Sequence, residues 1–144
     1  MLDPHPPLAS FPFALLTLVL IFELLSLRFK TEELRRASGF ILLALIIIAP
    51  MTFFSGYFAA DDASKSFQIP LEAIEEHRSF GKLFLLYLFP VALGKLTAEL
   101  RHDKKAFRLG YLICLVVSLV LAASASYHGG KLVFTYGAAV NLKE

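Results

Sequence analysis

The first apolar stretch of the chain reads Phe11-Pro-Phe-Ala-Leu-Leu-Thr-Leu-Val-Leu-Ile-Phe-Glu-Leu-Leu-Ser-Leu27, and its single charged residue, Glu23, stands near its end. A helix needs about 20 mostly apolar residues to cross about 30 Å of hydrocarbon. Three further stretches of this kind follow and, with the first, take up nearly the whole chain. The sequence therefore predicts an all-α membrane protein with four transmembrane helices, at about 11–29, 38–60, 77–99 and 106–128.

The composition excludes a soluble domain, because 57% of the 144 residues are hydrophobic and the mean hydropathy is +0.66. The first ten residues carry no Lys or Arg, so they lack the basic region that begins a secretory signal peptide. We therefore expect the first span to stay in the mature protein, and residues 1–144 to form one membrane domain. No motif in the chain indicates a nucleotide site, a hydrolase or a nucleic-acid binder.

The third span is the weakest of the four, because Lys82 and Lys95 interrupt it. Both lysines flank the apolar run Leu83–Gly94, near the ends of the span, where a long side chain can reach the membrane surface. We therefore expect this stretch to cross the membrane with both lysine side chains at the interfaces.

The basic residues predict the orientation. Nine of the fourteen Lys and Arg residues lie in or beside the connections after the first and third spans, in the ranges 28–36 and 95–108. Cytoplasmic connections carry such an excess, and short connections make successive helices antiparallel, so we expect an up-down-up-down bundle with N-out/C-out topology. The outer side then carries what we call the acidic group: Asp61, Asp62, Glu72, Glu75 and Glu76.

The segments outside the spans have their own signals. Gly129-Gly130 should end the fourth helix, and the β-branched and aromatic stretch Lys131–Tyr136 should lie along the outer interface as a short segment. Prolines should keep the arm around His5 stiff and extended. Pro70 suits a helix's first turn, so the third helix should begin about two turns outside the membrane, with His77 on its inward side.

Three of the four histidines, His5, His77 and His128, should lie near the same face of the membrane. Two imidazoles at one level on different helices are what a b-type haem needs as axial ligands. His77 and His128 each have a small residue one turn deeper, Gly81 and Ser124, where the edge of the ring could pass. We therefore predict that His77 and His128 ligate a single haem b. The alternative is two interface histidines bonded to lipid headgroups or backbone.

Other residues complete this hypothesis. Arg78, Lys82 and Lys131 are close enough in sequence to meet the anionic propionates of a haem. His5 is the reserve ligand if its arm folds over the bundle, and a solvated terminal histidine otherwise. Three histidines would also suit zinc or copper, which we rank below haem.

Two further polar residues receive structural interpretations. His102 lies among charged residues on the cytoplasmic side, where we expect it to be solvated, and this allows one haem at most. Glu23 lies inside the first span, where a carboxylate is a functional candidate by default. It is close to the interface, so we favour an ion pair with Arg28, Lys30 or Lys95 over a proton relay.

Three parts of the chain resemble a known family. His5–Leu15 resembles the opening of the family's sequences, a His-Pro pair followed by Phe-Pro at the start of the first span. Ser55-Gly56, followed by Asp61, resembles the end of the family's second span. Gly129–Val140 resembles the double-glycine signature that closes the family's sequences. The family is a bacterial four-span membrane family of unassigned function, domain of unknown function twenty-two thirty-one. The resemblance covers essentially the whole chain. It implies a bacterial inner membrane as the location and a layout similar to that of membrane b-type cytochromes.

The chain also differs from the family pattern. His77 falls where the family tends to have a histidine, but Ser10 stands where the family commonly has a second histidine before Phe-Pro. Ala139 replaces the second glycine of the closing signature.

Together these observations predict a membrane b-type haem protein that transfers electrons at the outer face and performs no bond-making chemistry of its own. Its expected partners are the lipid bilayer, a quinone or other membrane redox subunits, and a basic outer-side redox protein that meets the acidic group. The alternatives are a cofactor-free structural subunit of a larger membrane complex and, ranked below it, a metal-ion or small-solute permease.

Overall fold

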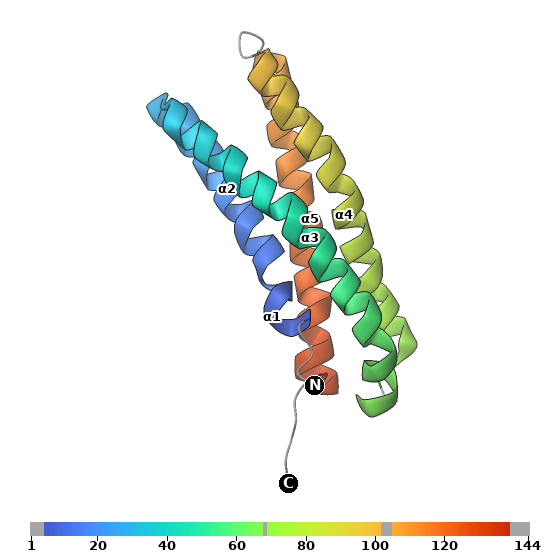
Figure 1. Cartoon of the computed structure of the whole chain (residues 1–144). Helices are drawn as coiled ribbons and strands as arrows, with labels where there is room; N and C mark the ends of the chain where they lie inside the picture. Colours follow the sequence, from blue (N-terminus) through green and yellow to red (C-terminus); the bar gives the residue numbers. More distant parts are fainter. Residues whose placement is uncertain (1–4, 68, 102–104, 139–144) are drawn as a thin grey trace.

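The computed structural model describes residues 5–67, 69–101 and 105–138, except for the side chains of residues 61–63 and 67. Helices make up nearly all of this part, and no strand occurs in it. The helices are α1 (His5–Ala9), α2 (Phe11–Phe29), α3 (Glu32–Phe67), α4 (Leu71–Leu100) and α5 (Lys105–Tyr136) (Figure 1). The prediction of an all-α protein is confirmed.

Four segments of the described chain are helical, long and apolar enough to cross a membrane: His5–Phe29, Glu32–Ser66, Leu71–Leu100 and Lys105–Tyr136. The predicted four-span layout is therefore confirmed. The helices after the first connection are longer than the spans that the sequence predicts. The second segment has 35 residues, about 52 Å at the usual rise, so it exceeds the hydrocarbon thickness by a wide margin.

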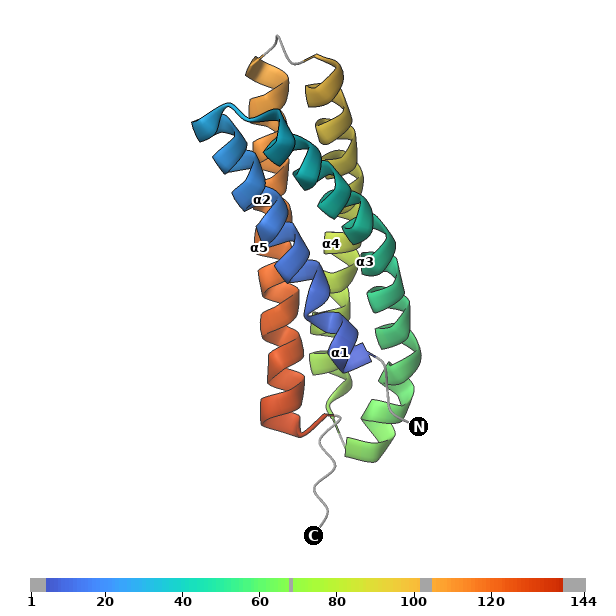
Figure 2. The ribbon, with the colours of Figure 1, turned by 60° about the vertical axis from the view of Figure 1, so that its left-hand side comes forward.

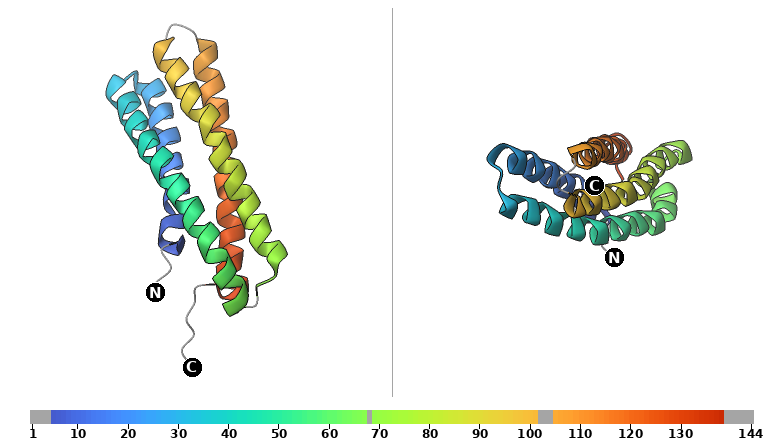
Figure 3. Two further views of the ribbon diagram at one scale, coloured as in Figure 1. Left: turned by 45° about the vertical axis from the view of Figure 1, so that its right-hand side comes forward. Right: turned by 90° about the horizontal axis from the view of Figure 1, so that it is seen from above.

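The bundle consists of two helical hairpins, α2–α3 and α4–α5, which pack against each other through α3 with α4 and α2 with α5. Lys30 makes the tight turn of the first hairpin in a left-handed conformation (φ 53°). The hairpins approach each other at the end that carries α1 and diverge toward the α2–α3 and α4–α5 connections (Figure 3). α1 and the end of α5 lie at the same end of the bundle (Figure 2).

The core lies between the inner faces of the four long helices. Leu16, Val19, Leu45, Val91 and Leu115 are completely buried there. The outer faces carry many large apolar side chains, and Phe40, Phe58 and Phe89 among them are about three-quarters exposed. Such an extensive apolar exterior suits lipid rather than water.

The predicted end of the fourth helix is wrong, because α5 continues through Gly129-Gly130 to Tyr136. Leu132 and Tyr136 pack there against the buried residues Ile69, Ala73 and Ile74. The predicted interfacial segment 131–136 is therefore the last part of a helix, since tertiary packing outweighs the low helix propensity of glycine and β-branched residues. The helix ends at Gly137, which has φ +72° and donates its N–H to Val133 O at 3.0 Å.

The N-terminal arm also differs from its prediction. It is not extended: residues 5–9 form the short helix α1, which packs on α3 (Figure 2). Pro6 and Pro7 fall in the first turn of this helix, where the N–H that proline lacks would have no partner in any case. The start of α4 agrees with its prediction, because Pro70 precedes Leu71 directly.

Candidate functional site

Two groups of polar side chains lie inside the bundle, one at each end. We call the first the histidine end, made of His5 on α1, His77 on α4 and His128 on α5. The ring centroids of His5 and His77 are 6.0 Å apart, with an angle of 68° between the rings. Residues that are far apart in sequence thus meet at the end of the bundle that carries α1.

His5 is fixed by α3. Its Nδ1 lies 3.1 Å from Thr52 O and 3.1 Å from Ser55 Oγ. Since a carbonyl oxygen only accepts, Nδ1 carries the hydrogen, and Nε2 then holds the lone pair of the neutral ring. The ring edge packs directly on Gly56, where a Cβ would be 2.5 Å from His5 Cε1. Any larger residue at position 56 would displace the imidazole.

His77 is fixed in the same way by α5. Its Nδ1 donates to Ala125 O at 2.9 Å, which again leaves the lone pair on Nε2. A Cβ at position 129 would lie 2.9 Å from His77 Cε1. Gly129 is therefore a contact residue for an imidazole from another helix and does not terminate α5.

His128 has different surroundings. Its ring stacks on Phe80 with centroids 4.9 Å apart and an angle of 21°. Its Nδ1 lies 3.2 Å from Glu76 Oε2, but the arrangement does not have hydrogen-bond geometry, and the atom has no hydrogen-bond partner among the described residues. The imidazole of His77 thus lies against that of His5, whereas the imidazole of His128 stacks on Phe80 of α4.

Gly81 and Ser124, the small residues predicted to leave room for a haem ring, have other neighbours in the structure. The Phe53 ring covers Gly81, at 3.6 Å from where a Cβ would be. Ser124 Oγ donates to Val120 O of its own helix at 3.0 Å. The backbone near Ser124 contributes instead, through the Ala125 carbonyl that holds His77.

Two of the three predicted cations, Arg78 and Lys82, lie beside an aromatic groove. A groove of about 350 Å³ is lined by Phe53, Phe54, Tyr57, Phe58, Arg78 and Lys82. Arg78 forms an ion pair with Glu75 and lies over the Tyr57 ring at 5.1 Å. Lys131 is exposed on α5. His102 lies outside the described residues, as do the side chains of Asp61 and Asp62.

A metal ion held by protein groups alone usually needs three or more ligands. No group of three or more His, Cys, Asp and Glu side chains in the described part of the chain is arranged to hold one. A haem needs only two protein ligands, because the macrocycle supplies the other donors.

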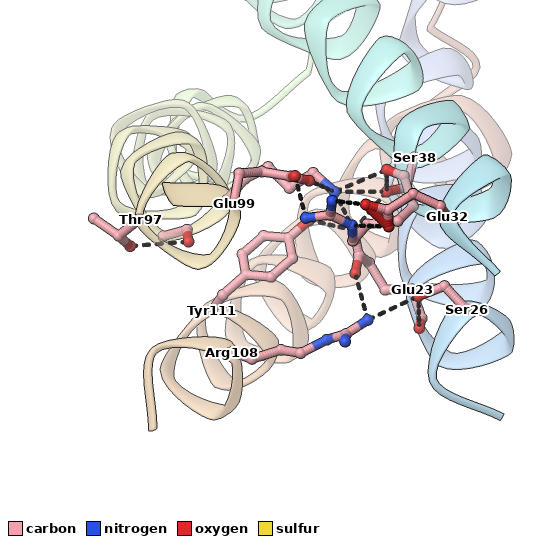
Figure 4. A network of polar contacts seen from close by, with 11 residues as sticks. Glu23, Ser26, Glu32, Ser38, Thr97, Glu99, Arg108 and Tyr111 are labelled. Atoms are coloured by element: carbon pink, nitrogen blue, oxygen red, sulfur yellow. Dashed lines mark hydrogen bonds and ion pairs between the residues drawn. The ribbon is translucent and has the colours of Figure 1, made fainter. Parts of the chain in front are cut away.

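We call the second group the charged end: Glu23 and Lys95 with the polar side chains around them, beside Lys30 and Thr31 of the α2–α3 connection. Glu23, Ser38, Glu99 and Tyr111 of this group are labelled in Figure 4. Glu23 is 1% exposed, and its Oε1 lies 2.6 Å from Lys95 Nζ. Ser38 donates its hydroxyl to the same carboxylate. The predicted ion pair of Glu23 is confirmed, and of the three candidate partners, Arg28, Lys30 and Lys95, it is Lys95 that forms it. Lys95 is 8% exposed, so its side chain turns into the bundle and not toward the membrane surface, contrary to the expectation.

Lys95 connects the pair to a larger network. Its Nζ also donates to Arg35 O at 2.9 Å and to Glu99 Oε1 at 2.8 Å. Arg35 pairs in turn with Glu99 and with Glu32. Charges of opposite sign therefore alternate from Glu23 to Glu32, across three helices.

Two residues of α5 approach Glu23 from the other side. Tyr111 is 1% exposed, and its hydroxyl lies 3.5 Å from Glu23 Oε1, a long hydrogen bond. Arg108 Nη2 lies 4.0 Å from Glu23 Oε2 and donates to Ser26 Oγ at 2.9 Å. Tyr111, Arg108, Arg35 and Glu99 carry no signal in the sequence that sets them apart from ordinary interface residues.

The comparisons with known proteins agree with this architecture. The model of a family described as "Predicted membrane protein (DUF2231)" matches residues 3–142. No curated protein and no solved structure matches the chain.

Proposed function

The chain belongs to the family of predicted membrane proteins described as DUF2231, and we propose that it holds one b-type haem at the histidine end and transfers electrons there. The family description supports a membrane protein and names no activity. The proposal therefore rests on the geometry of the histidines.

The observation that carries the proposal is that His5 and His77 have the same hydrogen bonding and the same packing. Each ring donates Nδ1–H to a backbone carbonyl, Thr52 O or Ala125 O, and each rests on a glycine. Histidines that ligate iron or another metal usually donate their second nitrogen in this way, which fixes the tautomer and the ring orientation. Two such rings with centroids 6.0 Å apart on α1 and α4 favour His5 with His77 as the ligand pair.

The side chains near His5 and His77 are of the kinds that bind haem: aromatic rings for the macrocycle and cations for the propionates. The groove beside Gly81 is aromatic, and Arg78 and Lys82 at its rim suit two propionates. The Phe53 ring occupies the space beside Gly81, so a flat macrocycle requires this side chain to turn away. When bound, haem supplies one-electron redox chemistry, while the protein orients its ligands and excludes water.

The orientation that the basic residues favour puts the histidine end on the outer side of a bacterial inner membrane. The expected donor is a quinone or another membrane redox subunit, and the expected acceptor is a basic protein outside. Thiol labelling tests this orientation: an impermeant reagent should label Lys143→Cys and not Glu33→Cys in intact cells, and outside labelling at position 33 would overturn it.

Absorption spectroscopy of the full-length protein, purified after growth with ample haem, tests the function. We expect a Soret band, split reduced bands and a positive pyridine haemochrome assay. His77→Ala and His5→Ala should abolish the low-spin spectrum, with His102→Ala as the control that leaves it intact. If His128→Ala abolishes it while His5→Ala does not, His77 and His128 form the pair, as the sequence predicts.

An absence of haem from correctly folded protein would dispose of the proposal. The cofactor-free structural subunit would then take its place, with the histidines serving only to join α1, α4 and α5.

A further inference from the structure

The charged end contains a cavity that is separate from the proposed haem site at the histidine end. Its volume is about 450 Å³, and it opens between the two hairpins near the α2–α3 connection. Four helices contribute to its walls, which include the cations Lys30, Arg35, Lys95 and Arg108 and the acids Glu23, Glu32 and Glu99. The lining thus has one more positive charge than negative charges.

The inner cations are neutralised by the protein itself. Lys95 Nζ contacts Glu23 and Glu99, with Arg35 O and Ser38 Oγ as additional acceptors. The Arg35 guanidinium is shared between Glu32 and Glu99. These cations have little capacity left for a ligand.

Arg108 and Thr31 are different. The guanidinium of Arg108 has five N–H groups, but its contacts among the described residues are one bond to Ser26 Oγ and a 4.0 Å approach to Glu23. Thr31 Oγ1 is buried and has no hydrogen-bond partner in the described part of the chain. Both residues line the cavity, and so does Lys30, whose side chain is exposed. Arg108 and Thr31 therefore bring donors to the cavity whose hydrogen-bonding capacity the described residues leave partly unused.

We propose that Arg108, Thr31 and Lys30 bind a phosphate group, either the headgroup of a phospholipid or a free phosphate ester. The planar guanidinium matches two phosphate oxygens, a hydroxyl donates to a third, and a lysine supplies a further charge. Basic pockets between membrane helices, near the surface, are a common form of headgroup site. This site is independent of any haem at the other end.

A thermal-stability assay of the purified full-length protein in neutral detergent tests the site. Inorganic phosphate should raise the melting temperature above that in chloride at equal ionic strength, or else phosphatidylglycerol should raise it above phosphatidylcholine. The first result identifies a free phosphate and the second a lipid headgroup. Arg108→Gln should weaken the effective ligand about tenfold or more, and Thr31→Val should weaken it less.

Arg28→Gln is the matched control, because Arg28 is an exposed arginine on α2 outside the cavity lining. It should leave the response unchanged. Thr31→Val keeps every charge, so it still tests the site if Arg108→Gln fails to fold. The proposal is overturned if neither probe stabilises the wild-type protein, or if Arg108→Gln and Thr31→Val respond as the wild-type protein does.

Discussion

The histidine end and the charged end both join the α1–α3 part of the chain to the α4–α5 part, but by different means. At the histidine end, imidazole rings are held by backbone carbonyls and rest on glycines, so the contact depends on shape. At the charged end, full charges are buried and neutralise one another, so the contact depends on complete pairing. The two ends should therefore fail under different substitutions.

The largest loss of stability should follow Lys95→Met. This substitution removes the principal partner of the Glu23 carboxylate, and Glu23 is 1% exposed. Breaking a buried pair by removing one partner costs about 3–5 kcal/mol, because the remaining charge is left uncompensated. Unfolding by denaturing detergent, followed by circular dichroism, would measure it. Lys82→Met is the matched control on the same helix, since Lys82 is exposed, and it should change stability by less than about 0.5 kcal/mol.

The double variant Glu23→Gln with Lys95→Met sharpens this result. Because it removes the uncompensated charge, it should recover a large part of the stability that Lys95→Met loses. A double variant as unstable as the single one would mean that packing around Lys95, and not charge pairing, stabilises this end.

The second effect concerns the histidine end. Gly56→Ala and Gly129→Ala would place a methyl group 2.5 Å and 2.9 Å from an imidazole carbon, and such overpacking costs about 1–3 kcal/mol. If haem is bound, its low-spin spectrum should weaken as well. Gly130→Ala is the control, since its nearest neighbour would be Phe134 at 3.9 Å, and it should stabilise α5 by up to about 1 kcal/mol. Equal effects at positions 129 and 130 would contradict the contact with His77.

Tyr111→Phe should have a smaller effect. The hydroxyl lies 3.5 Å from Glu23, so its removal should cost about 0.5 kcal/mol, at the low end for a hydrogen bond. The same unfolding assay applies. A loss several times larger would show that Tyr111 is essential for solvating the buried carboxylate.

The smallest effect should come from Glu72, Glu75 and Glu76, the members of the acidic group on α4. If the proposed electron transfer takes place, replacing these three residues by Gln should slow oxidation by a basic outer-side protein at low ionic strength, and the difference should shrink toward about 0.15 M salt. Stopped-flow oxidation kinetics would measure it. If the oxidation rate of the triple variant keeps the salt dependence of the wild-type protein, these glutamates do not bind the partner.

Much of the fold follows from the sequence, because apolar length alone fixes the number of spans. The end of the fourth helix does not follow from the sequence. Gly129 contacts the imidazole of His77, which lies 52 positions earlier in the chain, and local helix propensity does not depend on such a contact. Glu23 was identifiable as a paired residue because a carboxylate inside a span requires a partner. Arg35, Glu99 and Tyr111 were not, because their roles depend on how the helices rotate against one another.

The bond between Ser38 and Glu23 has a consequence for how the chain enters the membrane. Glu23 and Ser38 are 15 residues apart, whereas Lys95 follows Glu23 by 72 residues. During synthesis the first hairpin is therefore complete well before the ammonium group that neutralises its carboxylate has been made. Among the described partners of the Glu23 carboxylate, Ser38 is the one that the first hairpin itself supplies.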